Sequence, residues 1–158
     1  MTTASLQEIK KELRSHDADS LQELCMRLAK YKKENKELLN YLLFEAHNEQ
    51  AYIENVKEEI QELFKTIPAS NVYYIKKSLR RILRFVNKQV KYSGIKQTEV
   101  EVRIFFCIKV KEAKIPLTVG TVLFNLYRQQ LKKIEAALAK LPEDIQGDYE
   151  RELKLIFI

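Results

Sequence analysis

Residues 71–93 carry the pattern that most constrains the fold of this chain. Apolar residues recur there every three or four positions, which is the period of one helix face: Val72, Ile75, Leu79, Ile82, Leu83, Val86 and Val90. Cations occupy the opposite side: Lys76, Lys77, Arg80, Arg81, Arg84, Lys88 and Lys91. A helix turns by about 100° per residue, so six of these seven cations lie within about 60° of Lys77, counting Lys77 itself. This division predicts a surface helix whose apolar face packs on a core.

The rest of the chain also has the character of helices. Glycine and proline are scarce, with three of each in 158 residues, which favours long elements joined by short connections. Ser5, Ser20 and Thr98 each precede a glutamate by three positions, as in capping boxes, and Asn48 is a further cap. We expect an all-α protein with seven or eight antiparallel helices, near 5–14, 20–32, 35–46, 49–66, 71–93, 98–114, 118–140 and after Pro142. The length predicts a single domain over 1–158, built as a helical bundle or a short α-solenoid.

Residues 100–110 do not fit this scheme easily. Apolar side chains alternate with others from Val100 to Val110, and many are β-branched, as in a strand. A lone buried strand among helices would leave its backbone donors and acceptors unpaired. A second strand would have to come from residues 152–158 or from another subunit. We interpret 98–114 as a helix, because the capping box at Thr98 agrees and no good partner strand is present.

A weak internal sequence similarity bears on the architecture. Lys30 and Tyr31 precede the segment 39–44 much as Lys91 and Tyr92 precede the segment 102–107, with spacings that differ by two residues. In this respect the chain resembles HEAT-like α-helical repeats. The resemblance implies stacked helix pairs, and it carries no functional residues onto this chain.

The positive charge of the chain is concentrated around the same predicted helix. Between Leu63 and Thr98 there are nine cations and no acid, whereas the whole chain has a net charge of +6. We predict an anion-binding surface at the seven cations of the 76–91 segment, and aromatic residues along it are placed to stack bases: Tyr73, Tyr74, Phe85 and Tyr92. The predicted partner is a nucleic acid or an acidic protein. A membrane surface is the weakest candidate, since the apolar face is needed for the core.

An alternative interpretation assigns the basic helix no ligand. Residues 45–62 hold six acids against Lys57 alone, so the acidic helix 49–66 would neutralise its basic neighbour. The chain would then be a protein–protein interaction or oligomerisation module that uses apolar helix faces. The segments 41–44 and 104–108 are apolar nearly all round, so each is either a buried central helix or a contact with a second subunit or a peptide helix.

Sites for chemistry are scarce in this sequence. The three glycines are isolated, so no glycine-rich phosphate loop is present, and the spacing of Cys and His does not match a zinc site. Cys25 and Cys107 lie in apolar stretches, where a free cysteine behaves as a small hydrophobe. We expect a non-enzymatic protein without metal or cofactor. The absence of a secretory signal and of a long apolar run predicts a cytoplasmic protein without a membrane span.

Overall fold

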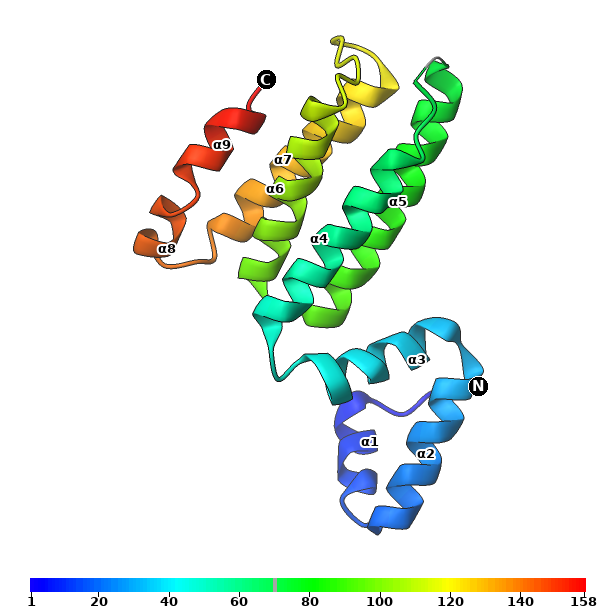
Figure 1. Cartoon of the computed structure of the whole chain (residues 1–158). Coiled ribbons are helices and arrows are strands. Elements are labelled where there is room, and N and C mark those ends of the chain that lie inside the picture. Colours follow the sequence, from blue (N-terminus) through cyan, green and yellow to red (C-terminus); the bar gives the residue numbers. More distant parts are fainter. Residues whose placement is uncertain (70) are drawn as a thin grey trace. The chain divides into compact units, whose positions relative to one another are not determined.

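The computed structural model describes residues 1–69 and 71–158 (Figure 1). Over these ranges it contains nine α-helices, one π-helical segment and no strand. The α-helices are α1 (Leu6–Leu13), α2 (Ala18–Tyr31), α3 (Lys33–Asn40), α4 (Glu49–Lys65), α5 (Val72–Ser93), α6 (Lys96–Glu112), α7 (Val122–Leu138), α8 (Glu143–Gly147) and α9 (Glu150–Ile156), and the π-helical segment η1 is Tyr41–Glu45. The predicted all-α class is confirmed, and the last predicted helix is divided into α8 and α9.

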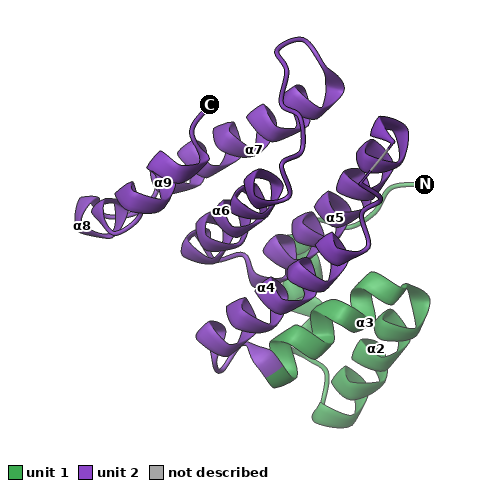
Figure 2. Ribbon diagram, turned by 45° about the horizontal axis from the view of Figure 1, so that its top comes forward, with its two compact units in different colours: residues 1–44 green, residues 45–158 purple. Residues whose placement is uncertain are grey.

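The chain forms two compact units, residues 1–44 and 45–158, which Figure 2 shows in different colours. The first unit holds α1, α2 and α3, and Tyr41 is its one buried residue among those described. The remaining buried residues of the described chain all belong to the second unit. The single domain expected over 1–158 stays a prediction, because each unit is described here by itself.

The helix starts show which capping signals the chain uses. Ser5 caps α1 as predicted: its hydroxyl accepts from the Glu8 amide at 3.2 Å, and Glu8 accepts from the Ser5 amide at 2.7 Å. The capping box predicted at Ser20 is wrong, because Asp17 caps α2 and accepts from the Ser20 amide at 2.8 Å. The Ser20 hydroxyl instead contacts His16 Nδ1 at 2.7 Å. Two caps three residues apart cannot both begin the same helix, and here the earlier one does.

The second unit is built around α6. Its long helices α4, α5, α6 and α7 run alternately up and down, and the chain then returns through α8 and α9 (Figure 1). Helix α6 packs against four other helices: α4, α5, α7 and α9. At about 100° per residue, its buried side chains therefore cover about two thirds of the helix circumference: Thr98, Val100, Val102, Arg103, Ile104, Phe106, Cys107 and Val110.

This central position explains the strand-like alternation of residues 100–110. A helix surrounded by others is apolar all round and loses the spacing of a single apolar face. The interpretation as a helix is confirmed, but the predicted start is wrong. Helix α6 begins at Lys96, two residues before the expected cap. The Thr98 hydroxyl is directed elsewhere, since it donates to Glu49 Oε1 of α4 at 2.7 Å.

Helix α5 agrees with the sequence in both its ends and its faces. Asn71 caps it by accepting from the Tyr73 amide at 2.9 Å. Gly94 ends it in the left-handed conformation at φ 68°, where its amide donates to the Val90 carbonyl at 3.0 Å. The apolar face is buried, as predicted, at Ile75, Leu79, Ile82, Leu83 and Val86. The prediction is wrong at Val72, which is 54% exposed, and Val90 is half-buried.

The two all-apolar segments have different environments. Ile104, Phe106 and Cys107 are buried in α6, as expected of a central helix. In the other segment Tyr41 is buried, whereas Leu42, Leu43 and Phe44 are 56, 62 and 66% exposed, so the buried alternative does not hold for these three residues. No helix within residues 1–69 and 71–158 has the length and apolar character needed to cross a membrane. The HEAT-like resemblance and the choice between bundle and solenoid stay predictions.

Candidate anion-binding surface

The predicted cations lie on one continuous surface of α5. We call Lys76, Lys77, Arg80, Arg81, Arg84, Lys88 and Lys91 the cationic face of α5. Lys76 and Lys88 are half-buried, and the other five are exposed. A rise of about 1.5 Å per residue makes the face about 22 Å long. The apolar side of the same helix is buried, so the orientation of the helix is fixed by the core and its charges are turned outward.

Most of the cationic face has no internal counter-ion. In the part of the chain that the structure describes, Lys76, Lys77, Arg80, Arg84 and Lys91 have no carboxylate oxygen within 4 Å. Arg81 donates from Nη2 to the Thr66 hydroxyl at 2.8 Å, a neutral partner that leaves its charge uncompensated. Lys88 does have a partner.

Three carboxylates of α4, those of Glu49, Glu54 and Glu62, have partners outside the cationic face. Glu54 and Glu62 form ion pairs with lysines of their own helix, at 3.7 Å to Lys57 and 2.6 Å to Lys65. Lys57 also lies 3.6 Å from Glu101 of α6. Glu49 accepts hydrogen bonds from the hydroxyls of Ser93 and Thr98, near the end of α5 and the start of α6. These contacts connect α4 to itself and to the junction between α5 and α6. None of them involves Lys76, Lys77, Arg80, Arg84 or Lys91.

The predicted aromatic residues fall into two groups. Tyr73 and Tyr74 are exposed, 62 and 50%, at the start of α5. Their ring centroids are 5.3 Å apart with an interplanar angle of 77°, so each ring has a free face. Phe85 and Tyr92 are half-buried further along the helix. The structure therefore brings two of the four candidate aromatics together as open rings beside the cations.

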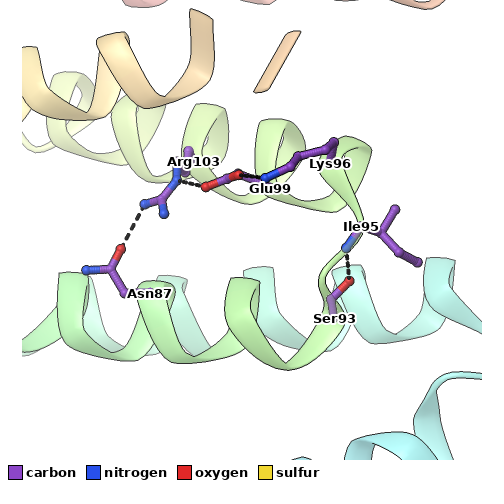
Figure 3. Close-up of polar contacts among 6 residues, drawn as sticks. All are labelled: Asn87, Ser93, Ile95, Lys96, Glu99 and Arg103. Atoms are coloured by element: carbon purple, nitrogen blue, oxygen red, sulfur yellow. Dashed lines mark hydrogen bonds and ion pairs between the residues drawn. The ribbon is translucent and has the colours of Figure 1, made fainter. Parts of the chain in front are cut away.

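A buried polar cluster behind α5 was not predicted from the sequence. Arg103 of α6 is 4% exposed, and it donates from Nε to Glu99 at 2.9 Å (Figure 3). Its Nη1 donates to the side-chain oxygens of Asn87 at 3.0 Å and Gln130 at 2.8 Å. One guanidinium thus joins α5, α6 and α7. The spacing of four residues between Glu99 and Arg103 was the signal available in the sequence.

Burial favours the neutral forms of two groups, the Cys107 thiol and the Tyr149 phenol. Burial raises the pKa of the Cys107 thiol to about 12, which the nearby Arg103 charge only partly offsets. Burial likewise raises the pKa of Tyr149 to about 12, and its hydroxyl donates to Glu101 at 2.9 Å. A thiol that stays protonated is a poor nucleophile. Cys25 is exposed, contrary to the small-hydrophobe interpretation, whereas Cys107 fits it.

Comparison with known proteins adds no assignment. Across the described residues, no group of three or more His, Cys, Asp or Glu side chains is placed to hold a metal ion. No protein-family model, curated protein or solved structure matches the chain. A functional interpretation therefore depends on the physical chemistry of its own surfaces.

Proposed function

We propose that this protein is a non-enzymatic binding module whose cationic face on α5 contacts a polyanion, with nucleic acid as the preferred partner. The observation that carries the proposal is the row of five cations, Lys76, Lys77, Arg80, Arg84 and Lys91, that have no carboxylate within ion-pair distance among the described residues. These charges are solvated, and they are available to pair with an external anion.

The charge pattern of α5 is costly for folding alone. Like charges three and four residues apart on a helix destabilise it by about 0.2–0.5 kcal/mol per pair. The pairs Lys77–Arg81, Arg80–Arg84 and Arg84–Lys88 repeat this spacing along the helix. Glutamine or glutamate at some of these positions would allow the same burial of the apolar face without the repulsion. A binding role for the outer face accounts for a pattern that packing does not require.

Nucleic acid fits this surface better than the other polyanions. Cations that recur every three or four residues lie about 5–6 Å apart and can face successive phosphates of a backbone. The open rings of Tyr73 and Tyr74 beside them offer the stacking surface that bases use in single strands. An acidic protein would use the cations but not the rings. A membrane would need a free apolar face, and that of α5 is buried.

The salt dependence of oligonucleotide binding tests the proposal. Contact with four or five phosphates gives a log–log slope of about −4 on duplex, at about −0.9 per phosphate. We expect the triple variant Lys77→Gln/Arg80→Gln/Arg84→Gln to bind more weakly with a slope nearer −1, because these three side chains are exposed and open. Fluorescence anisotropy titrations of single- and double-stranded oligonucleotides over a series of salt concentrations measure it.

A matched control separates local contact from net charge. The variant Lys132→Gln/Lys140→Gln/Lys154→Gln removes the same three charges from exposed positions of the second unit outside α5. It should keep the wild-type slope. Equal slopes in both triple variants would contradict contact through α5, and no binding by the wild-type protein at about 50 mM salt would contradict the nucleic-acid proposal as a whole.

Exposed apolar side chains in the first unit support a second candidate function, a protein–protein interaction or oligomerisation module. Leu42, Leu43 and Phe44 are more than half exposed, and Cys25, Leu28 and Leu38 help to line a cavity of about 200 Å³ between α2 and α3. Light scattering coupled to gel filtration at two salt concentrations tests this alternative. A dimer that persists at both salts and is lost on Leu43→Gln/Phe44→Gln supports it, whereas a monomer throughout contradicts self-association.

A further inference from the structure

A pocket at the C-terminal end of α5 has an unusual concentration of cations. It has a volume of about 550 Å³, within the range of small-ligand sites, and is formed by α5, the connection at Gly94 and Ile95, the start of α6, and Lys133 of α7. We call it the α5–α7 pocket. Five cations line it: Lys88, Lys91, Lys96, Arg103 and Lys133. Glu99 is the single carboxylate among its lining residues.

The one carboxylate is already committed to the protein. Glu99 Oε2 accepts from Arg103 Nε at 2.9 Å, and Glu99 Oε1 lies 3.4 Å from Lys96 Nζ (Figure 3). Arg103 is held in place at the pocket wall by Asn87 and Gln130. Lys88 has a partner and is left out of the balance. The other four cations against one carboxylate leave an excess of three positive charges around a space large enough for a ligand. Lys91 and Lys133 have no carboxylate within 4 Å in the described parts of the chain.

Two further observations fit an anion in this pocket. The N-cap of α6 is Ile95, which has no side-chain oxygen, so no side chain caps the first amides of that 17-residue helix. Free amides at a helix start favour anions. Desolvation and, secondarily, the charge of Arg103 lower the pKa of Lys133, with Glu99 opposing. The protonated amine of Lys133 is therefore in an environment that an additional negative charge would relieve.

We propose that the α5–α7 pocket binds the terminal phosphomonoester of a nucleic-acid strand whose backbone lies along the cationic face of α5. This inference rests on the proposed function. Lys88 and Lys91 belong both to the cationic face and to the pocket lining, so the positive surface continues without a break from one to the other. A terminal phosphate has about twice the charge of a backbone diester and three acceptor oxygens. A strand end can also enter a pocket that a continuous backbone can only pass over.

Oligonucleotides that differ only in their end groups test the inference. We would compare one single-stranded sequence with a 5′-phosphate, with a 3′-phosphate and with neither, each labelled at the opposite end or internally, by fluorescence anisotropy on the full chain. We expect one phosphorylated strand to bind about tenfold more tightly than the unphosphorylated strand, the size of one charge-assisted contact. The variant Lys96→Gln/Lys133→Gln should abolish that preference and keep the affinity for the unphosphorylated strand. The control Lys132→Gln/Lys140→Gln, at exposed sites outside the pocket lining, should retain the preference.

Each outcome separates this inference from the proposed function. Equal binding of all three strands overturns the terminal-phosphate site and leaves the polyanion proposal standing. A preference that survives Lys96→Gln/Lys133→Gln also overturns the site, because it places the contact elsewhere. A parallel thermal-shift titration with inorganic phosphate at constant ionic strength distinguishes a small free anion from a strand end. Stabilisation by phosphate without binding of any strand overturns both proposals, since the pocket would then serve a small ligand.

Discussion

Helices α5 and α6 follow one another in the chain and contact each other, yet their surfaces are divided in different ways. Helix α5 buries one face, and its other face is a row of cations. Helix α6 contacts four helices and buries side chains over most of its circumference, including a cation, Arg103, which is 4% exposed. The Arg103 side chain has three hydrogen-bond partners, whereas most cations of α5 have no carboxylate nearby in the described residues.

This difference separates the roles of charge in the protein. At the buried positions of α6 a charge is tolerated only where hydrogen bonds replace water, so Arg103 serves the packing of three helices. In α5 the charges remain in water and contribute little to packing. Stability should therefore depend on α6, and anion binding should depend on α5. Variants of the two helices can test whether the two properties separate in this way.

The largest expected effect is the loss of an aromatic ring from α6. Phe106 is 1% exposed and contacts Phe64 edge to face, with ring centroids 5.6 Å apart. We expect Phe106→Ala to lower the free energy of unfolding by about 4 kcal/mol, because it removes buried apolar surface and leaves a cavity. Urea denaturation followed by circular dichroism measures it. Phe106→Leu is the control and should cost less than about 1.5 kcal/mol. A loss below about 1 kcal/mol for the alanine variant would mean that α6 is not the centre of the core.

Breaking the Arg103 cluster should have the next largest effect. Arg103→Met leaves Glu99, Asn87 and Gln130 without their shared donor. Removal of one partner of a buried pair costs about 3 kcal/mol. The double variant Glu99→Gln/Arg103→Met should recover part of this loss, since residue 99 is then neutral, whereas in the single variant the Glu99 carboxylate keeps only Lys96 as an ion-pair partner. Equal stabilities of the single and double variants, measured by urea denaturation, would show that the Glu99 charge is compensated without Arg103.

Much of this architecture could be predicted from the sequence, because α5 and its caps depend on local signals. Asn71 and Gly94 end the helix through contacts within two to four residues, and such contacts are visible in the order of the residues. The cap predicted at Thr98 fails for the opposite reason. Its hydroxyl donates to Glu49, which is 49 positions away along the chain. A tertiary partner of this kind cannot be inferred from spacing.

The candidate site likewise has one part that local sequence signals predict and one part that depends on tertiary contacts. The cationic face of α5 follows from helical period alone, so all seven of its residues could be named from the sequence. The α5–α7 pocket could not, because Lys133 and Lys96 meet only after α7 has returned along α6. The exposure of Leu42, Leu43 and Phe44 was also beyond the sequence pattern, since apolar residues on every side of a helix are more typical of a buried one.

A smaller effect is expected where α9 meets α6. The Tyr149 hydroxyl donates to Glu101 at 2.9 Å, and burial raises the pKa of Tyr149 from 10.0 to about 12. The folded protein thus holds the neutral phenol more strongly than the unfolded chain does. The stabilisation is complete below about pH 10 and is lost as the pH rises towards 12. We expect Tyr149→Phe to cost about 1 kcal/mol at neutral pH and less at about pH 11. Urea denaturation of the wild-type protein and the variant at the two pH values measures this cost. The titration of lysines at about pH 11 affects both proteins equally, so it cancels in the difference between them. If the two proteins differ in free energy of unfolding by the same amount at both pH values, the raised pKa of Tyr149 is contradicted.

The smallest expected effect is a gain in stability, and it concerns the cationic face of α5. Lys77 is exposed and precedes Arg80 and Arg81 by three and four positions. Lys77→Glu replaces two repulsive spacings with attractive ones, in the favourable order of an acid before a base. At the lower end of the per-pair values it should raise the free energy of unfolding by about 0.8 kcal/mol. Lys77→Gln is the matched control and should gain about half as much, because it removes repulsion without adding attraction. Both gains should shrink in about 1 M salt, where the charges are screened. A loss of stability on Lys77→Glu would show that the cationic face contributes to the fold, and the contrast between α5 and α6 would then be one of degree only.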